Sequence, residues 1–131
     1  MKAKLVMAAA ALSLAPLIAG AQQYPVKPVR VVIPWPPGGS NDVVGRIVTQ
    51  KLSETMGQQF IVDNRGGASG MIGAESVAKS PPDGYTLMIH SATHIANPHL
   101  YGKLPYDTLK DFVGVAPLSV QVLIDATEDR S

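Results

Sequence analysis

The segment at residues 34–42, Pro-Trp-Pro-Pro-Gly-Gly-Ser-Asn-Asp, constrains the fold more than any other part of the sequence. Its three prolines lack amide hydrogens and fix φ, so neither a strand nor a helix can run through them. Gly38 and Gly39 then allow backbone conformations that are closed to other residues. An apolar run precedes the segment at 29–33, and an amphipathic run follows it at 42–56. The sequence therefore predicts a strand, a sharp loop and a helix in succession.

The start of this helix is suited to bind a small anion. Ser40 or Asn41 is expected as the N-cap, and Asp42 in the first turn is expected mainly to improve capping. The first helical amides have no partner within the helix, and the helix dipole favours negative charge beside them. A carboxylate is the natural guest. The packing stripe is expected to comprise Val44, Ile47, Val48, the stem of Lys51 and Leu52, with Gly57 ending the helix.

Two further strand-and-loop units follow along the chain. Strands are expected at 60–63 and 85–89, a helix at 71–79, a turn at 80–84, a short helix or turn up to about residue 101, and extended chain at 113–124. This alternation predicts an α/β fold with parallel βαβ units and right-handed crossovers. Loops that follow parallel strands bind ligands in such sheets. We call them the first loop (34–41), the second loop (64–70) and the third loop (90–93). The first and third loops are expected to meet at one edge, with the place of the second left open, and together the loops offer Ser40, Asn41, Ser69, Ser91 and Thr93 as hydrogen-bonding residues.

Composition excludes several classes of function. The chain has no cysteine, so it has neither disulfides nor a thiol nucleophile. Its formal charge of +1 gives no argument for nucleic-acid binding. The glycines fit neither a P-loop nor a dinucleotide fingerprint, and no cofactor is expected. His90, His94 and His99 have no acidic ligand nearby and Pro98 interrupts them, so we expect surface or loop histidines and no metal site.

The first 21 residues are typical of an export signal. Lys2 and Lys4 precede an apolar run at 5–18, which is short for a membrane span, and Ala19-Gly20-Ala21 forms a small-x-small cleavage site. The sequence therefore predicts a cleavable signal peptide at 1–21, a mature chain from Gln22, and a periplasmic location.

Four separated motifs together resemble one family. The stretch at 24–42 looks like the opening of the Bug family, the extracytoplasmic solute receptors of tripartite tricarboxylate transporters. Agreement continues at 63–65 with 67–74, at 82–87, and from Asn97-Pro98 through Leu104-Pro105-Tyr106-Asp107 to Asp111-Phe112.

The resemblance implies a lobe of the periplasmic-binding-protein type (type II) with a mostly parallel sheet, and a receptor that captures small organic acids. It implies no catalytic residue, and as partners the ligand and the membrane components of a tripartite transporter. The chain is expected to act as a monomer. Matching motif positions carries the ligand contacts onto Gly39, Ser40, Asn41, Asp42, Ala68, Ser69, Gly70, Thr93 and His94.

The sequence also departs from the family pattern. Gly66 stands where a proline is usual, and His90 stands where a glycine is usual, so its side chain is expected to narrow the third loop. Family members continue for more than twice this length, and the polar tail at 125–131 does not match them. We therefore expect an incomplete, truncated first lobe at 22–124 that binds weakly or not at all.

Two other interpretations stay open from the residues. One is an exported α/β enzyme acting on a carboxylate, with Asp42 or His94 as the acid or base. The other is a degenerate, non-functional product.

Overall fold

The structure is a computed structural model, and it describes residues 24–118. Its strands are β1 (Val29–Ile33), β2 (Phe60–Asn64) and β3 (Thr86–Met88), and its α-helices are α2 (Ser40–Met56), α3 (Met71–Ala78) and α4 (Thr93–Leu100). A short 3-10 helix, η1 (Ala68–Gly70), leads directly into α3. The expected signal at 1–21, the tail at 125–131 and part of the extended stretch expected at 113–124 lie outside the described residues, and 113–118 form no strand.

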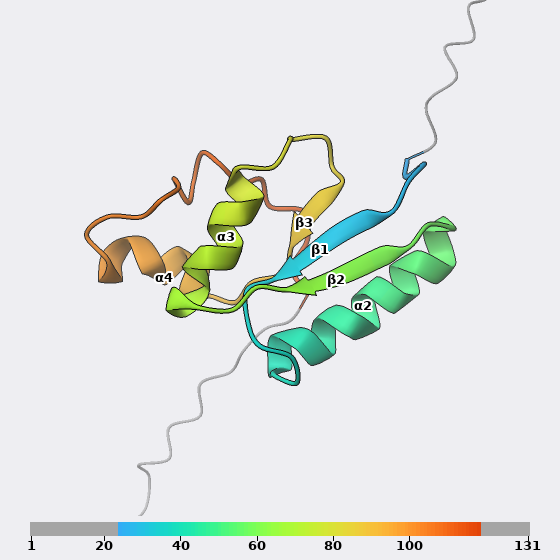
Figure 1. Ribbon diagram of the computed structural model, residues 1–131, viewed down its shortest axis with the longest axis horizontal. Helices are drawn as coiled ribbons and strands as arrows, with labels where there is room; N and C mark the ends of the chain where they lie inside the picture. Colours follow the sequence, from blue (N-terminus) through green and yellow to red (C-terminus); the bar gives the residue numbers. More distant parts are fainter. Residues whose placement is uncertain (1–23, 119–131) are drawn as a thin grey trace, which may run out of the picture.

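The three strands form a parallel sheet in the order β2-β1-β3 (Figure 1). The chain moves from β1 to β2 through α2, and then returns across β1 to reach β3 through α3. Two right-handed crossovers in opposite directions place their helices on opposite faces, and Figure 1 shows α2 and α3 on the two sides of the sheet. The predicted α/β fold with a parallel sheet is confirmed.

The core lies between the sheet and α2. Val29, Val31 and Phe60 are buried there, and the partly buried Leu52, Tyr85, Leu87 and Ile89 pack against them. Alternate residues of a strand point to opposite faces, so Arg30 and Val32 belong to the α3 side. β1 is almost wholly buried because it is the central strand and is covered on both faces.

The packing face of α2 differs from the expected apolar stripe. Ile47 is 65% exposed and Lys51 is exposed, whereas Asp42, Gly45 and Thr49 are the buried positions. The reason is close approach of α2 to β1, since a Cβ on Gly45 would lie 2.5 Å from Ile33 Cδ1. Small and hydrogen-bonded residues therefore occupy the closest contact, while Val44, Val48 and Leu52 of the expected stripe are half-buried and Ile47 faces outward. The expected helix end is confirmed, since Gly57 is the C-cap with φ 69°.

The segment after α4 has no regular structure, yet part of it is packed. Tyr106 and Thr108 are buried, while Leu109 and Val113 are largely exposed. Within residues 24–118, no helix is long and apolar enough to cross a membrane.

Candidate functional site: a neutral pocket at the start of helix α2

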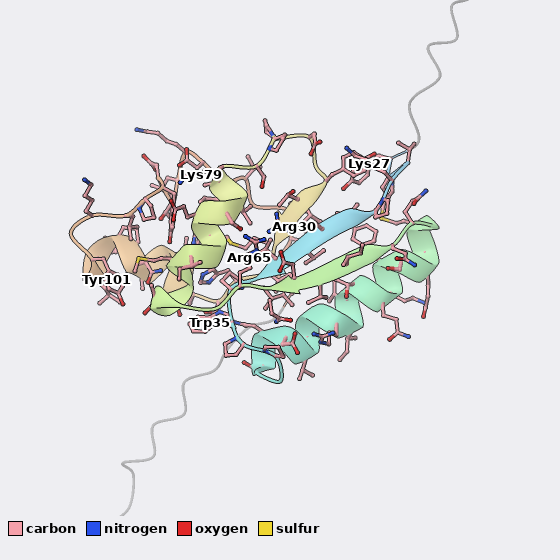
Figure 2. All side chains as sticks on the ribbon, viewed as in Figure 1. Lys27, Arg30, Trp35, Arg65, Lys79 and Tyr101 are labelled. Carbon is pink, nitrogen blue, oxygen red and sulfur yellow. The ribbon has the colours of Figure 1, made fainter. Side chains whose placement is uncertain are left out.

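The first and third loops meet at the carboxyl ends of the strands and enclose a pocket. Its volume is about 380 Å³, and its lining residues are Trp35, Pro36, Gly39, Ser40, Asn41, Ser91 and Thr93. Figure 2 shows Trp35 just past the end of β1. Of the expected ligand contacts, the structure therefore brings together Gly39, Ser40, Asn41 and Thr93.

The first turn of α2 presents free backbone amides to this pocket. The N-cap is Gly39, which has extended φ and ψ, and no side chain caps the helix. The expectation of a Ser40 or Asn41 cap is therefore wrong, because the chain enters the helix one residue earlier. The first helical hydrogen bond is donated by Val43 N to Gly39 O at 3.0 Å. The amides of Ser40 and Asn41 precede it, and the dipole of a 17-residue helix adds partial positive charge there.

The buried Asp42 side chain fixes the first loop through hydrogen bonds and does not line the pocket. Its Oδ2 accepts hydrogen bonds from Gly38 N at 2.9 Å and Arg46 Nε at 3.0 Å, and its Oδ1 accepts one from Asn64 Nδ2 at 2.9 Å. These donors, with the Arg46 bond the largest cause, lower the pKa of Asp42 to about 2. Both oxygens are thus occupied inside the protein, and the side chain is buried rather than part of the pocket lining.

The second loop does not line the pocket. Ser69 Oγ lies 2.7 Å from Tyr101 Oη, and Ser69 O accepts a hydrogen bond from Asn97 Nδ2 at 3.2 Å, which ties the loop to α4. Ala68 and Ser69 have φ of 47° and 53°, a left-handed conformation that is costly for residues with a Cβ. The expected contacts Ala68, Ser69 and Gly70 are therefore assembled into η1 beside α4 and lie apart from the pocket walls.

The third loop contributes hydroxyl groups. Ser91 Oγ and Thr93 Oγ1 lie 3.0 Å apart at the pocket, and either can donate to the other. His94, one residue further, does not line the pocket.

His94 is buried among aromatic rings. It stacks on Tyr106 with centroids 5.6 Å apart and meets Phe112 edge-on at 4.7 Å. Burial lowers its pKa. The expectation of surface or loop histidines is wrong for His94, because the segment at 104–112 folds back over α4, which spacing alone does not show. Among the described residues, no group of three or more histidine, cysteine, aspartate or glutamate side chains could hold a metal ion.

Sequence reasoning missed parts of the site. Trp35 is not among the expected ligand contacts, yet it lines the pocket. Arg46 and Asn64, which hold Asp42, were not singled out. The i, i+4 spacing of Asp42 and Arg46 was a readable signal for one of these contacts.

A second depression, of about 530 Å³, is lined by Pro98 of α4 and by residues 104–109. It contains none of the residues that the three-loop argument identified.

Comparisons with known proteins agree on one family. Residues 44–127 match the family model described as "Tripartite tricarboxylate transporter family receptor". Protein BugT of Bordetella pertussis is 38% identical over 112 residues, which are 84% of this chain and 34% of BugT.

Solved structures are similar as well. The periplasmic binding protein BugD is 37% identical with a TM-score of 0.65, over 68% of this chain and 30% of BugD. MatC from Rhodopseudomonas palustris, solved with bound malate, is 42% identical with a TM-score of 0.63, over 68% of this chain and 31% of MatC.

The chain spans between 27% and 35% of the length of the curated relatives that it matches. The family match nevertheless covers more than half of the chain, and it includes α2 from Val44 onward and the second and third loops. The chain belongs to the tripartite tricarboxylate transporter receptor family.

Proposed function

We propose that this chain supplies one wall of the carboxylate site of a periplasmic solute receptor, which captures small organic acids for a tripartite transporter. The observation that carries the proposal is the uncapped start of α2, whose free amides open onto a pocket with no charged lining residue. Backbone amides and neutral hydroxyls suit a carboxylate, because they donate hydrogen bonds to its oxygens and place no negative charge beside it.

Gly39, Ser40, Asn41 and Thr93 are the proposed ligand contacts, together with Ser91 of the third loop. Asp42 is proposed to act indirectly, since it anchors Gly38 and so holds the loop in shape. Ala68, Ser69, Gly70 and His94 do not line the pocket. Any effect of these four residues on the ligand is therefore indirect and acts through the residues that do line it.

The residues considered for catalysis support binding rather than chemistry. Asp42 has both carboxylate oxygens occupied by protein donors, and His94 is enclosed by Tyr106 and Phe112. Neither faces the pocket. We therefore propose a receptor without catalytic residues, exported to the periplasm, with residues 22–124 as part of its first lobe.

Malate, the ligand bound to MatC, is the probe for a direct test. We expect malate to shift the amide resonances of Gly39, Ser40 and Asn41 in ¹⁵N–¹H spectra of the full chain. The uncharged diamide of malic acid is the matched ligand control and should leave them unmoved. Equal shifts with the diamide, or no shifts at these amides with malate, would refute the proposal.

Ser40 offers a variant that removes one amide without disturbing the helix. It is the first helical residue, and Gly39 before it has φ −75° and ψ 168°, a conformation that proline accepts in its predecessor. Ser40→Pro removes the amide and the hydroxyl, while Ser40→Ala removes the hydroxyl only. Because a hydrogen bond to a charged group contributes about 1.5–3 kcal/mol, we expect malate to bind at least about tenfold more weakly to S40P than to S40A. Thr55→Ala, in the last turn of the same helix, should bind like the wild type.

A further inference from the structure

His90 lies where the three loops come together. Its ring meets Trp35 of the first loop edge-on, with centroids 6.0 Å apart. A Cβ added to Gly70 of the second loop would lie 2.5 Å from His90 Nε2. Within the third loop, Ser91 N donates a hydrogen bond to His90 Nδ1 at 2.9 Å. One imidazole therefore contacts a pocket wall, the second loop and the backbone of a pocket residue.

The Ser91 contact determines the form of the ring. A backbone amide can only donate, so in this contact Nδ1 accepts, and the single proton of the neutral imidazole is then on Nε2, which is buried without a hydrogen-bond partner among the described residues. A protonated imidazole carries hydrogens on both nitrogens and cannot accept from Ser91 N. It can only turn its Nδ1–H toward Ser91 O, which lies 3.2 Å away.

The one described neighbour that favours a positive charge on His90 is the backbone of Ser91, whose hydrogen bond raises the pKa of the ring against the effects of burial and His94. The titratable group that faces it from α4 is His94, with ring centroids 5.0 Å apart, and Tyr106 faces His94 from the segment after α4. The first and second loops present Trp35 and Gly70 to the ring, neither of which titrates. Within residues 24–118, no carboxylate forms an ion pair with either histidine.

We propose that His90 is a positioning residue of the pocket, which holds the Ser91–Thr93 hydroxyl pair at the rim only while its imidazole is neutral. Its effect on ligand binding rests on the proposed function, whereas its effect on Ser91 does not. Protonation of His90 breaks the hydrogen bond that its Nδ1 accepts from Ser91 N, so the third loop shifts relative to the first.

The direction of the pH dependence follows from burial. Burial and the neighbouring His94 lower the pKa of His90 from 6.5 to about 4. His90 is neutral while the three loops are packed together, so it stabilises that arrangement fully above pH 6.5. That stabilisation is lost as the pH falls from 6.5 toward 4, because the released form takes up the proton first. Acidification across this window therefore disfavours the assembled pocket, by up to about a hundredfold for one such histidine.

The chain provides its own reporter and its own control. Trp35 is its single tryptophan, and a protonated imidazole beside an indole quenches the indole emission. His99, at the exposed end of α4, is the third of the three histidines. We propose to measure Trp35 emission and the Ser91 amide shift in the full chain without ligand, between about pH 7.5 and about pH 4.5. The variants are His90→Asn, whose Oδ1 can accept from Ser91 N without titrating, and His99→Asn.

In the wild type and in H99N, we expect both signals to change together with a midpoint below pH 6.5. In H90N, both should be independent of pH while the Ser91 shift stays close to that of the neutral wild type. Retention of the transition in H90N, or its loss in H99N, would overturn the proposal.

A second arm repeats the titration with malate. We expect malate binding to weaken on acidification about tenfold more in the wild type than in H90N. Protonation of malate itself weakens binding equally in both proteins, so it cancels in this comparison. If the Ser91 and Trp35 transitions occur as expected but malate binds at no pH, the positioning role stands and the proposed function fails. If malate binds and the ligand-free transitions are absent, the positioning role fails alone.

Discussion

Replacement of Gly73 by alanine tests how closely α3 must approach the first loop. A Cβ at Gly73 would lie 2.8 Å from Arg65 O, 2.8 Å from Pro34 Cβ and 3.0 Å from Pro34 Cα. None of these atoms can rotate away. Pro34 follows β1 directly, and Arg65 N is bound to Ile33 O at 2.9 Å, so both belong to the backbone framework around the central strand.

Two opposing effects decide how much Gly73→Ala changes the free energy of unfolding. Alanine is favoured over glycine in a helix by about 1 kcal/mol. Overpacking costs about 1–3 kcal/mol, and rigid neighbours place Gly73→Ala at the upper end of that range. The net effect is a loss of about 2 kcal/mol in the free energy of unfolding. With a urea dependence of about 2 kcal/mol per molar, the unfolding midpoint should fall by about 1 M.

The assay is urea unfolding of the full chain, followed by Trp35 emission. Gly102→Ala is the matched control, since no atom lies within 4 Å of its added Cβ, and its stability should change by less than about 0.5 kcal/mol. If G73A is as stable as the wild type or more stable, helix propensity outweighs the contact. The reasoning about close approach of α3 would then be wrong.

Two other predictions concern the loops. Asp42 has a pKa lowered from 3.8 to about 2, so its ionised form stabilises the fold fully above pH 3.8, and this contribution is lost as the pH falls toward 2. Asp42→Asn should remove that part of the pH dependence of stability, which is measured as the urea unfolding midpoint against pH. The same profile in Asp42→Asn and the wild type would contradict the prediction. Ala68 has φ 47°, so Ala68→Gly should relieve about 1–2 kcal/mol of backbone strain and lose less than that to unfolded-state entropy, which a thermal melt would record as a higher midpoint.

The strands could be predicted because each is a short apolar run bounded by proline, glycine or polar residues. Val29–Ile33 has the expected bounds, and the run at 60–63 extends by one residue to Asn64. The run at 85–89 is shorter in the structure, where only Thr86–Met88 pair as a strand. Parallel order followed from the alternation with helices, which leaves few topologies.

The inner face of α2 could not be predicted from hydrophobic periodicity. Its buried positions are Asp42, Gly45 and Thr49, of which none is a large apolar residue. Each is buried for a reason that depends on other parts of the chain: Asp42 bonds Asn64, and Gly45 meets Ile33. Such tertiary pairings are absent from a local pattern of apolar residues.

The pocket itself was partly predictable. The argument from loops after parallel strands placed the first and third loops at one edge, and the family resemblance added Gly39. Of these loops, Gly39, Ser40, Asn41, Ser91 and Thr93 line the pocket. The argument did not predict that the second loop lies outside the pocket. Ser69 of that loop contacts Tyr101, which is 32 residues away in the sequence, and local spacing does not show such a contact. The ligand role of all these residues stays a prediction.

The order β2-β1-β3 has a consequence for how the chain acquires its structure. The central strand is the first to be synthesised, while its two neighbours come later in the sequence, separated from it by α2 and by α3. Val31 and Val32 therefore have no strand partner until β2 is made, and β1 keeps an open edge until β3 is made. During that interval a strongly apolar strand is available to pair with other chains. The molecule thus depends on its emerging central strand being shielded until residue 88 has been added.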